Sequence, residues 1–135
     1  MKCKLISILL VSALAPMVSL NAQSLQNLSE VEQIEAFDNI YVKQLDDDSL
    51  SSTYLIWVKS GVKRHYHEHH TEVVYVLEGK GIMQLNEDEK TIAQGDYVFI
   101  PKGTRHSVKV EGEIPMKVIS IQSPRFDGKD RIFEP

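Results

Sequence analysis

The sequence is poor in cysteine and in aromatic side chains, with one Cys and 7% aromatics among 135 residues. A single cysteine excludes a disulfide-rich scaffold and a zinc site built from several thiolates. Positive charge is also scarce, since 15 Lys and Arg against 19 Asp and Glu leave a formal charge of −4. Because a nucleic-acid binder needs a basic face, this balance argues against a nucleic-acid partner. The ordinary Gly and Pro content excludes collagen-like and low-complexity chains, and the length suits one domain.

Residues 1–22 differ in character from the rest of the chain. Two lysines precede a short apolar run over 5–15, and no acidic residue occurs before Glu30. A basic tip, a short apolar stretch and a small-residue exit are typical of a secretory signal peptide. We expect cleavage after Ala22 and a periplasmic or secreted protein. An uncleaved anchor is disfavoured because the apolar run is shorter than the ~20 residues of a membrane span.

Cleavage after Ala22 would change the formal charge and the cysteine content of the chain. The signal segment carries two lysines and no acid, so the mature chain of 113 residues has a formal charge of −6. Cys3, the only cysteine, is also removed. The mature chain then forms no disulfide, and core packing must hold it together, aided by a metal if one binds. We expect no stable membrane insertion after cleavage.

The start of the mature chain, residues 23–39, is expected to be a polar leader with a short helix. Ser29 is followed three residues later by Glu32, which is the spacing of a capping box. Apolar residues then recur at roughly helical spacing. The pattern predicts one short helix near 30–37.

Beyond Asn39 the chain consists of short apolar runs separated by turn signals. The runs are rich in β-branched and aromatic residues, which strands favour. They cover 40–42, 54–58, 73–77, 82–85, 97–100, 107–110 and 116–121. The turn signals fall at 46–49, 78–81, 86–90, 95–96, 101–103 and 111–112. This pattern predicts an all-β sandwich or barrel over 40–123, followed by a tail over 124–135.

Four of the five histidines lie in one segment, 65–72, and the fifth is His106. Alternate residues of a strand point to one face, so His65 and His67 should project together. Neutral imidazole is the commonest transition-metal ligand, and the carboxylate of Glu72 adds charge nearby. Four ionisable groups turned into a small barrel need a compensating cation. The segment therefore predicts a metal site.

These residues resemble the two sequence motifs of the cupin family. The first motif is similar over His65-Tyr66-His67, four residues, Glu72, six residues and Gly79. The second is similar over Gly95, Pro101, Gly103 and His106, with Val110 where the family motif ends in Asn. The motifs span 61–106, and the strand pattern extends the likeness over about 40–123. The resemblance implies a double-stranded β-helix, or jelly-roll, barrel with His65, His67, Glu72 and His106 as metal ligands.

The leading glycine of the family motif favours a different pair, His67 and His69. With that pair only two residues would separate His69 from Glu72, which is shorter than the family spacing. We favour His65 and His67, because a leading glycine only shapes a turn and can shift. His69 and His70 then remain as alternate metal ligands, or as exposed or rim residues at the barrel mouth.

Three histidines and one carboxylate suit one divalent transition ion, with Fe, Mn, Ni, Co, Cu and Zn all compatible. An open coordination position allows an enzyme of oxygenase, isomerase or lyase type that acts on a small polar molecule. Two alternatives remain: a metal-dependent module that binds a sugar or organic acid, and a cupin with a structural metal. Likeness to cupins favours the enzyme, although this fold is a poor guide to function. No catalytic residue is indicated, and Arg105 and Lys102 are candidate contacts for an anionic substrate.

The resemblance also bears on partners. A small-molecule ligand or substrate is expected at the metal site. Many similar bacterial cupins pair through an edge strand, which implies a homodimer.

Overall fold

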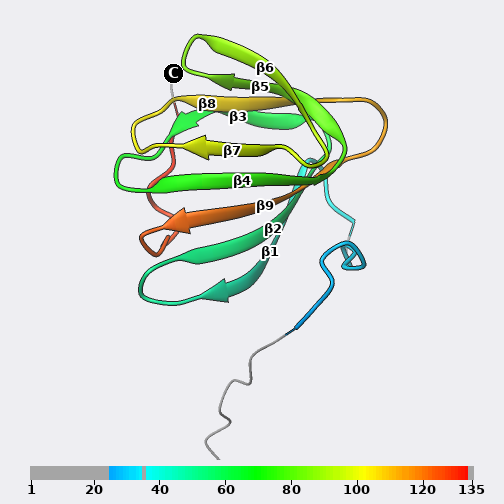
Figure 1. Cartoon of the computed structure of the whole chain (residues 1–135), viewed down its shortest axis with the longest axis horizontal. Coiled ribbons are helices and arrows are strands. Elements are labelled where there is room, and N and C mark those ends of the chain that lie inside the picture. The colour runs from blue at the N-terminus through cyan, green and yellow to red at the C-terminus, as the bar shows by residue number, and fades with distance from the viewer. Residues whose placement is uncertain (1–24, 35, 134–135) are drawn as a thin grey trace, which may run out of the picture.

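In the computed structural model of the chain, residues 25–34 and 36–133 are described, and they form strands and no helix. The predicted all-β fold is confirmed, and the described part contains no helix able to cross a membrane. The strands are β1 (Ile40–Asp47), β2 (Ser52–Val58), β3 (Gly61–Tyr66), β4 (Thr71–Glu78), β5 (Lys80–Leu85), β6 (Asp88–Ala93), β7 (Tyr97–Ile100), β8 (His106–Glu111), β9 (Met116–Ser123) and β10 (Ile132–Phe133). They build two antiparallel five-stranded sheets, ordered β1-β2-β9-β4-β7 and β10-β3-β8-β5-β6 (Figure 1).

Two tight connections explain the central hairpins. Gly79 alone joins β4 to β5 with a φ of 81°, and a Cβ there would lie 2.9 Å from the Cα of Met116, so only glycine fits. Asn86 and Glu87 form a two-residue turn between β5 and β6, with Asn86 at a φ of 52°. The turn expected over 86–90 is therefore shorter than predicted, and β6 begins at Asp88.

The barrel interior changes from apolar to polar along its strands. On β4 the inward Val76 is fully buried, whereas Glu72 faces inward nearer the start of the strand. On β9 the inward positions pass from Met116 and Val118 to Ser120 and Gln122. The apolar cluster consists of Val76, Met83, Ile92, Val98, Ile100, Met116 and Val118. The polar end beyond this cluster is where the histidines lie.

The helix predicted near 30–37 is wrong for the described residues of that segment. The Asn27 side chain closes a local turn instead, accepting from the backbone N–H of Ser29 at 3.2 Å and from its hydroxyl at 2.7 Å. The expected apolar stripe also finds nothing to pack on, since Ile34 is 82% exposed. A helix this short is marginal without tertiary packing. The expected signal peptide, residues 1–22, lies outside the described residues.

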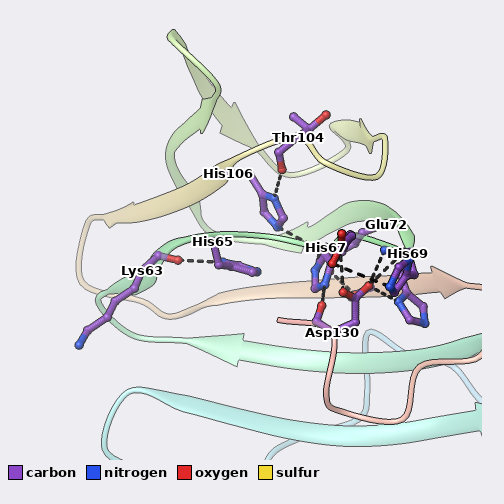
Figure 2. Close-up of polar contacts among 11 residues, drawn as sticks. Lys63, His65, His67, His69, Glu72, Thr104, His106 and Asp130 are labelled. Carbon is purple, nitrogen blue, oxygen red and sulfur yellow. Dashed lines mark hydrogen bonds and ion pairs between the residues drawn. The ribbon is translucent and has the colours of Figure 1, made fainter. Parts of the chain in front are cut away.

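The segment after β9 is tied to the barrel at several points, although most of its residues are exposed. Its strand β10 pairs with β3, placing Ile132 opposite Tyr66. The carboxylate of Asp130 accepts from the backbone N–H groups of Glu68, His69 and His70 at 2.8–3.1 Å and contacts Nδ1 of His70 at 2.5 Å (Figure 2). These hydrogen bonds lower the pKa of Asp130 to about 2, against the opposing effect of burial. The tail thus fixes the loop between β3 and β4.

Replacing an isoleucine by alanine should destabilise the protein more in the buried core than on the surface. Ile100 is 1% exposed, whereas Ile114 is 60% exposed. Ile100→Ala should lower the free energy of unfolding by about 2–5 kcal/mol, because it leaves a cavity in the cluster. Ile114→Ala should change it by less than about 0.5 kcal/mol. Urea unfolding of both variants measures the difference, and equal effects would contradict the assigned core.

The Asp130 contacts predict a second effect on stability. Asp130→Ala should lower the free energy of unfolding by about 2–3 kcal/mol, because three backbone N–H groups, one of them in a buried hydrogen bond, lose their acceptor. Asp127→Ala, three residues away on the same tail and exposed, should cost less than about 0.5 kcal/mol. Thermal melts of the two variants make the comparison. An Asp130 variant as stable as the Asp127 variant would show that the tail does not hold the loop.

Candidate metal centre

Four side chains converge at the polar end of the barrel, from three strands and one loop (Figure 2). His65 lies on β3, Glu72 on β4 and His106 at the start of β8, while His67 follows directly after β3. The antiparallel register places His65 opposite His106. All four side chains are buried, and one ligand atom from each lies within 4.8 Å of the others. The structure thus brings together the set favoured from the sequence.

Backbone carbonyls orient the three imidazole rings. The Nδ1 atoms of His65 and His106 donate to the carbonyl oxygens two residues earlier in the chain, at 2.8 and 2.9 Å. Nδ1 of His67 donates to the carbonyl oxygen of Asp130 in the tail. A carbonyl only accepts, so each Nδ1 carries a proton, and in the neutral form of each ring the lone pair is on Nε2. Metal-binding histidines are oriented by such second contacts.

Glu72 provides the negative charge at the centre of the group. Its Oε2 lies 3.3 Å from Nε2 of His67 and 3.2 Å from Nε2 of His106. Its Oε1 accepts a hydrogen bond from the hydroxyl of Ser120 at 2.5 Å. Burial raises the pKa of Glu72, but the contacts with His106, His67 and Ser120 outweigh burial and lower it. The carboxylate therefore stays ionised although it is buried.

The histidines differ in their affinity for protons. Burial, together with the charge of His106, lowers the pKa of His65 to about 4, so its ring is neutral at neutral pH. Burial also lowers the pKa of His67, but Glu72 and the Asp130 carbonyl outweigh it, and the net pKa is raised. A metal ion at Nε2 of His67 would compete with a proton for the same lone pair.

The donor atoms fit a divalent transition ion. Nε2 of His67 and Nε2 of His106 are buried, and within the described part of the chain they face Oε2 of Glu72 at 3.3 and 3.2 Å without forming a hydrogen bond of good geometry. Buried polar atoms without partners are costly and need an explanation. A cation that accepts these lone pairs would satisfy them, and imidazole with carboxylate is a donor set of Fe, Mn, Ni, Co, Cu and Zn sites.

The other two histidines of the cluster point elsewhere. The His69 side chain is 73% exposed and lies 3.9 Å from the carboxylate of Glu68. His70 is buried, but its Nδ1 contacts Asp130 and its Nε2 contacts the carbonyl oxygen of Arg125 at 3.0 Å. Both ring nitrogens of His70 contact oxygen atoms of the tail, so neither points toward the converging group. Neither residue belongs to the converging group.

The expected contacts for an anionic substrate also lie apart from the group. Lys102 and Arg105 are both exposed, and neither lines the cavity beside the histidines. The guanidinium of Arg105 lies 5.3 Å from the centre of the Tyr66 ring. The loop that carries Lys102 instead supports the centre through Gly103, whose N–H donates to the His67 carbonyl at 2.6 Å and whose φ is 80°.

Sequence reasoning missed several residues around the centre. Ser120 and Gln122 are buried on β9, while the isoleucine between them, Ile121, is 38% exposed. Polar residues facing inward and apolar residues facing outward reverse the usual strand pattern, and this reversal was the available signal. Asp130 and Arg131 gave no signal, because the path of the tail brings them to the barrel. Arg131 lines the cavity beside His65, Glu72 and His106.

Comparisons with known proteins agree with this architecture. The family model described as a cupin domain matches residues 53–122, which is more than half of the chain. An uncharacterised protein of Aquifex aeolicus is 30% identical over 118 residues, covering 86% of this chain and 97% of that protein. Quercetin 2,3-dioxygenase of Bacillus subtilis is 35% identical over 60 residues, covering 44% of this chain and 18% of that enzyme.

Solved structures show the same fold. KdgF from Halomonas sp. superposes with a TM-score of 0.66 at 23% identity, covering 78% of this chain and 96% of that one. The protein TT1209 from Thermus thermophilus superposes with a TM-score of 0.68 at 22% identity, covering 76% of this chain and 98% of that one. Together with the family match and the full-length relative, these likenesses show that the chain belongs to the cupin family.

Proposed function

We propose that the protein is an exported, metal-dependent cupin enzyme that acts on a small polar molecule. The observation that carries this proposal is the convergence of three carbonyl-oriented imidazoles and one ionised, buried carboxylate. His65, His67, Glu72 and His106 would hold one divalent transition ion. Such an ion, when bound, supplies Lewis-acid activation of a substrate oxygen or of water.

The remaining groups of the site would position and shield the reacting molecule. Ser120 donates to Glu72 and fixes the orientation of its carboxylate. The cavity beside the centre has a volume of about 90 Å³ and is lined mostly by valine, isoleucine and methionine side chains, which restrict access of water. Arg131 brings a positive charge to the same cavity. These residues would bind and orient a molecule rather than react with it.

One observation favours a second function, a metal-dependent binding module without turnover. Apart from Glu72, no carboxylate lines the cavity among the described residues. General acid–base chemistry usually relies on an acid or base that is not itself a metal ligand. Incubation of the loaded protein with a small-metabolite extract separates the two functions. Depletion of a metabolite that the His106→Ala variant leaves unchanged supports the enzyme, whereas retention without conversion supports the binding module.

Export is proposed from the pattern of residues 1–22, and a homodimer from the outer face of one sheet. Tyr75, Tyr97, Phe99 and Ile121 are exposed on the neighbouring strands β4, β7 and β9. The register pairs Tyr75 with Tyr97 and places Val73 between Phe99 and Ile121, so their side chains share one face. A contiguous exposed apolar face of this kind is typical of a protein interface.

The metal content of the protein tests the proposed function. Protein purified from the periplasm should contain about one equivalent of a divalent transition ion per chain. His106→Ala should lower the affinity for that ion more than about 100-fold, because a ligand is lost, whereas His69→Ala should retain it. Elemental analysis measures the ion, and the intact mass of the same sample locates the cleavage after Ala22.

Two outcomes decide the metal proposal. A metal content below about a tenth of an equivalent, with no loss of metal or stability in His106→Ala, contradicts the metal centre. Loss of metal in both His106→Ala and His69→Ala would place the ion at a different site, since the His69 side chain is exposed.

The homodimer proposal predicts a charge-sensitive interface. Phe99→Glu should convert the dimer to a monomer, because it buries a carboxylate in the apolar face. Ile114→Glu introduces the same charge at an exposed apolar position outside the patch and should leave the dimer intact. Light scattering during size-exclusion chromatography measures the mass. A wild-type protein of monomeric mass, or a Phe99 variant that is still dimeric, contradicts the interface.

A further inference from the structure

Two hollows of opposite chemistry adjoin the candidate metal centre. The inner cavity of about 90 Å³ touches His65, Glu72 and His106 and has apolar walls. A larger cleft of about 510 Å³ lies between strands β1, β2 and β9 and the tail, and we call it the tail cleft. Its volume falls within the ~300–1,000 Å³ typical of small-molecule sites. Val42, Ile56 and Arg131 line both hollows, so the tail cleft adjoins the inner cavity beside the metal centre.

Arg131 lies at this boundary, since it lines both hollows, although the residue is also exposed to solvent. Its backbone is fixed on both sides, by Asp130 on the β3–β4 loop and by Ile132 in the pairing of β10 with β3. A guanidinium matches the geometry of a carboxylate and binds it with two parallel hydrogen bonds. The position therefore suits the anionic group of a small ligand.

The other charges on the cleft wall have partners within the protein. Asp47 is paired with Arg125, with Nε at 2.8 Å and an Nη at 2.6 Å from the same carboxylate oxygen. Asp127 lies 3.8 Å from Nζ of Lys129. Each of these two ion pairs is neutral as a whole. Arg131 is therefore the remaining charged residue on the cleft wall, and its positive charge favours an anionic ligand.

Gln122 supplies a second, independent signal for a ligand. Its side chain is 2% exposed and lines the tail cleft. Its amide oxygen is buried without a hydrogen-bond partner among the described residues. The register of β4 and β9 places Gln122 directly opposite Glu72, next to the metal centre. A buried acceptor without a donor is rare in native proteins, and a ligand with an O–H or N–H group would satisfy it.

We propose that the tail cleft binds a small hydroxylated carboxylate, with its carboxylate on Arg131 and a hydroxyl donating to the amide oxygen of Gln122. This inference rests on the proposed function, because it names the class of substrate that the metal centre would act on. The polar walls of the cleft, which include Gln44 and the hydroxyl of Tyr54, suit further hydroxyl groups. The apolar inner cavity leaves room only for a small, uncharged part of the ligand.

Three six-carbon probes test the two recognition elements separately in the zinc-loaded, full-length mature protein. D-gluconate carries a carboxylate and hydroxyls, hexanoate only the carboxylate, and sorbitol only the hydroxyls. Gluconate should bind at least about tenfold more tightly than either of the others, because only gluconate engages both groups. Isothermal titration calorimetry measures the affinities, and zinc content is determined before and after each titration.

Matched variants test whether Arg131 binds the carboxylate of gluconate and whether Gln122 binds its hydroxyl. Arg131→Met keeps an unbranched stem but removes the charge, and it should weaken gluconate binding at least about tenfold. Lys80→Met removes an exposed charge on β5, outside the lining of the tail cleft, and should leave gluconate binding unchanged. Gln122→Leu should abolish the preference for gluconate over hexanoate while hexanoate still binds. Retained hexanoate binding shows that the Gln122 variant is folded.

The outcomes separate this inference from the proposed function. Failure of the wild-type protein to take up zinc contradicts the metal centre. Zinc uptake with gluconate affinity unchanged in Arg131→Met overturns the carboxylate assignment alone. Equal affinities for gluconate and hexanoate in the wild type overturn the role of Gln122. Sorbitol binding as tight as gluconate overturns the requirement for an anion.

Discussion

A buried negative charge is the constraint on which the polar end of the barrel depends. Glu72 is ionised yet only 7% exposed, and a buried charge is tolerated only with partners. Ser120 satisfies one carboxylate oxygen, and two imidazole nitrogens lie beside the other. The strands of both sheets must therefore keep their register, since a shift by one residue would turn Glu72 out of the barrel.

The chain end completes the site that the strands begin. His65 and His106 are oriented by carbonyls of their own local segments, whereas His67 depends on the carbonyl of Asp130, 63 residues away in sequence. The same residue holds the loop after His67 through its carboxylate. Arg131, the next residue, reaches the cavity. The tail therefore couples the geometry of the candidate metal centre to the shape of the cleft beside it.

Local patterns predicted the strands and the converging group because both depend on near neighbours or on fixed spacings. The run 73–77 lies within β4, and the likeness of the sequence to the two cupin motifs implied the four side chains that are buried together. The helix near 30–37 failed because its capping signal had no surface to pack on. Strand β6 was missed because four of its six residues are exposed and polar or charged. Arg131 and Asp130 could not be predicted, since their positions follow from the three-dimensional path of the tail.

The position of a bound divalent ion decides whether the four converging side chains form a metal centre. X-ray absorption spectroscopy of the zinc-loaded protein, combined with anomalous diffraction from its crystals, measures this position directly. The account predicts one ion per chain with nitrogen ligands from His65, His67 and His106 at roughly 2.0–2.1 Å and an oxygen ligand from Glu72. An ion bound at an exposed site such as His69, or a fully loaded protein in which these four side chains remain without metal, would contradict it.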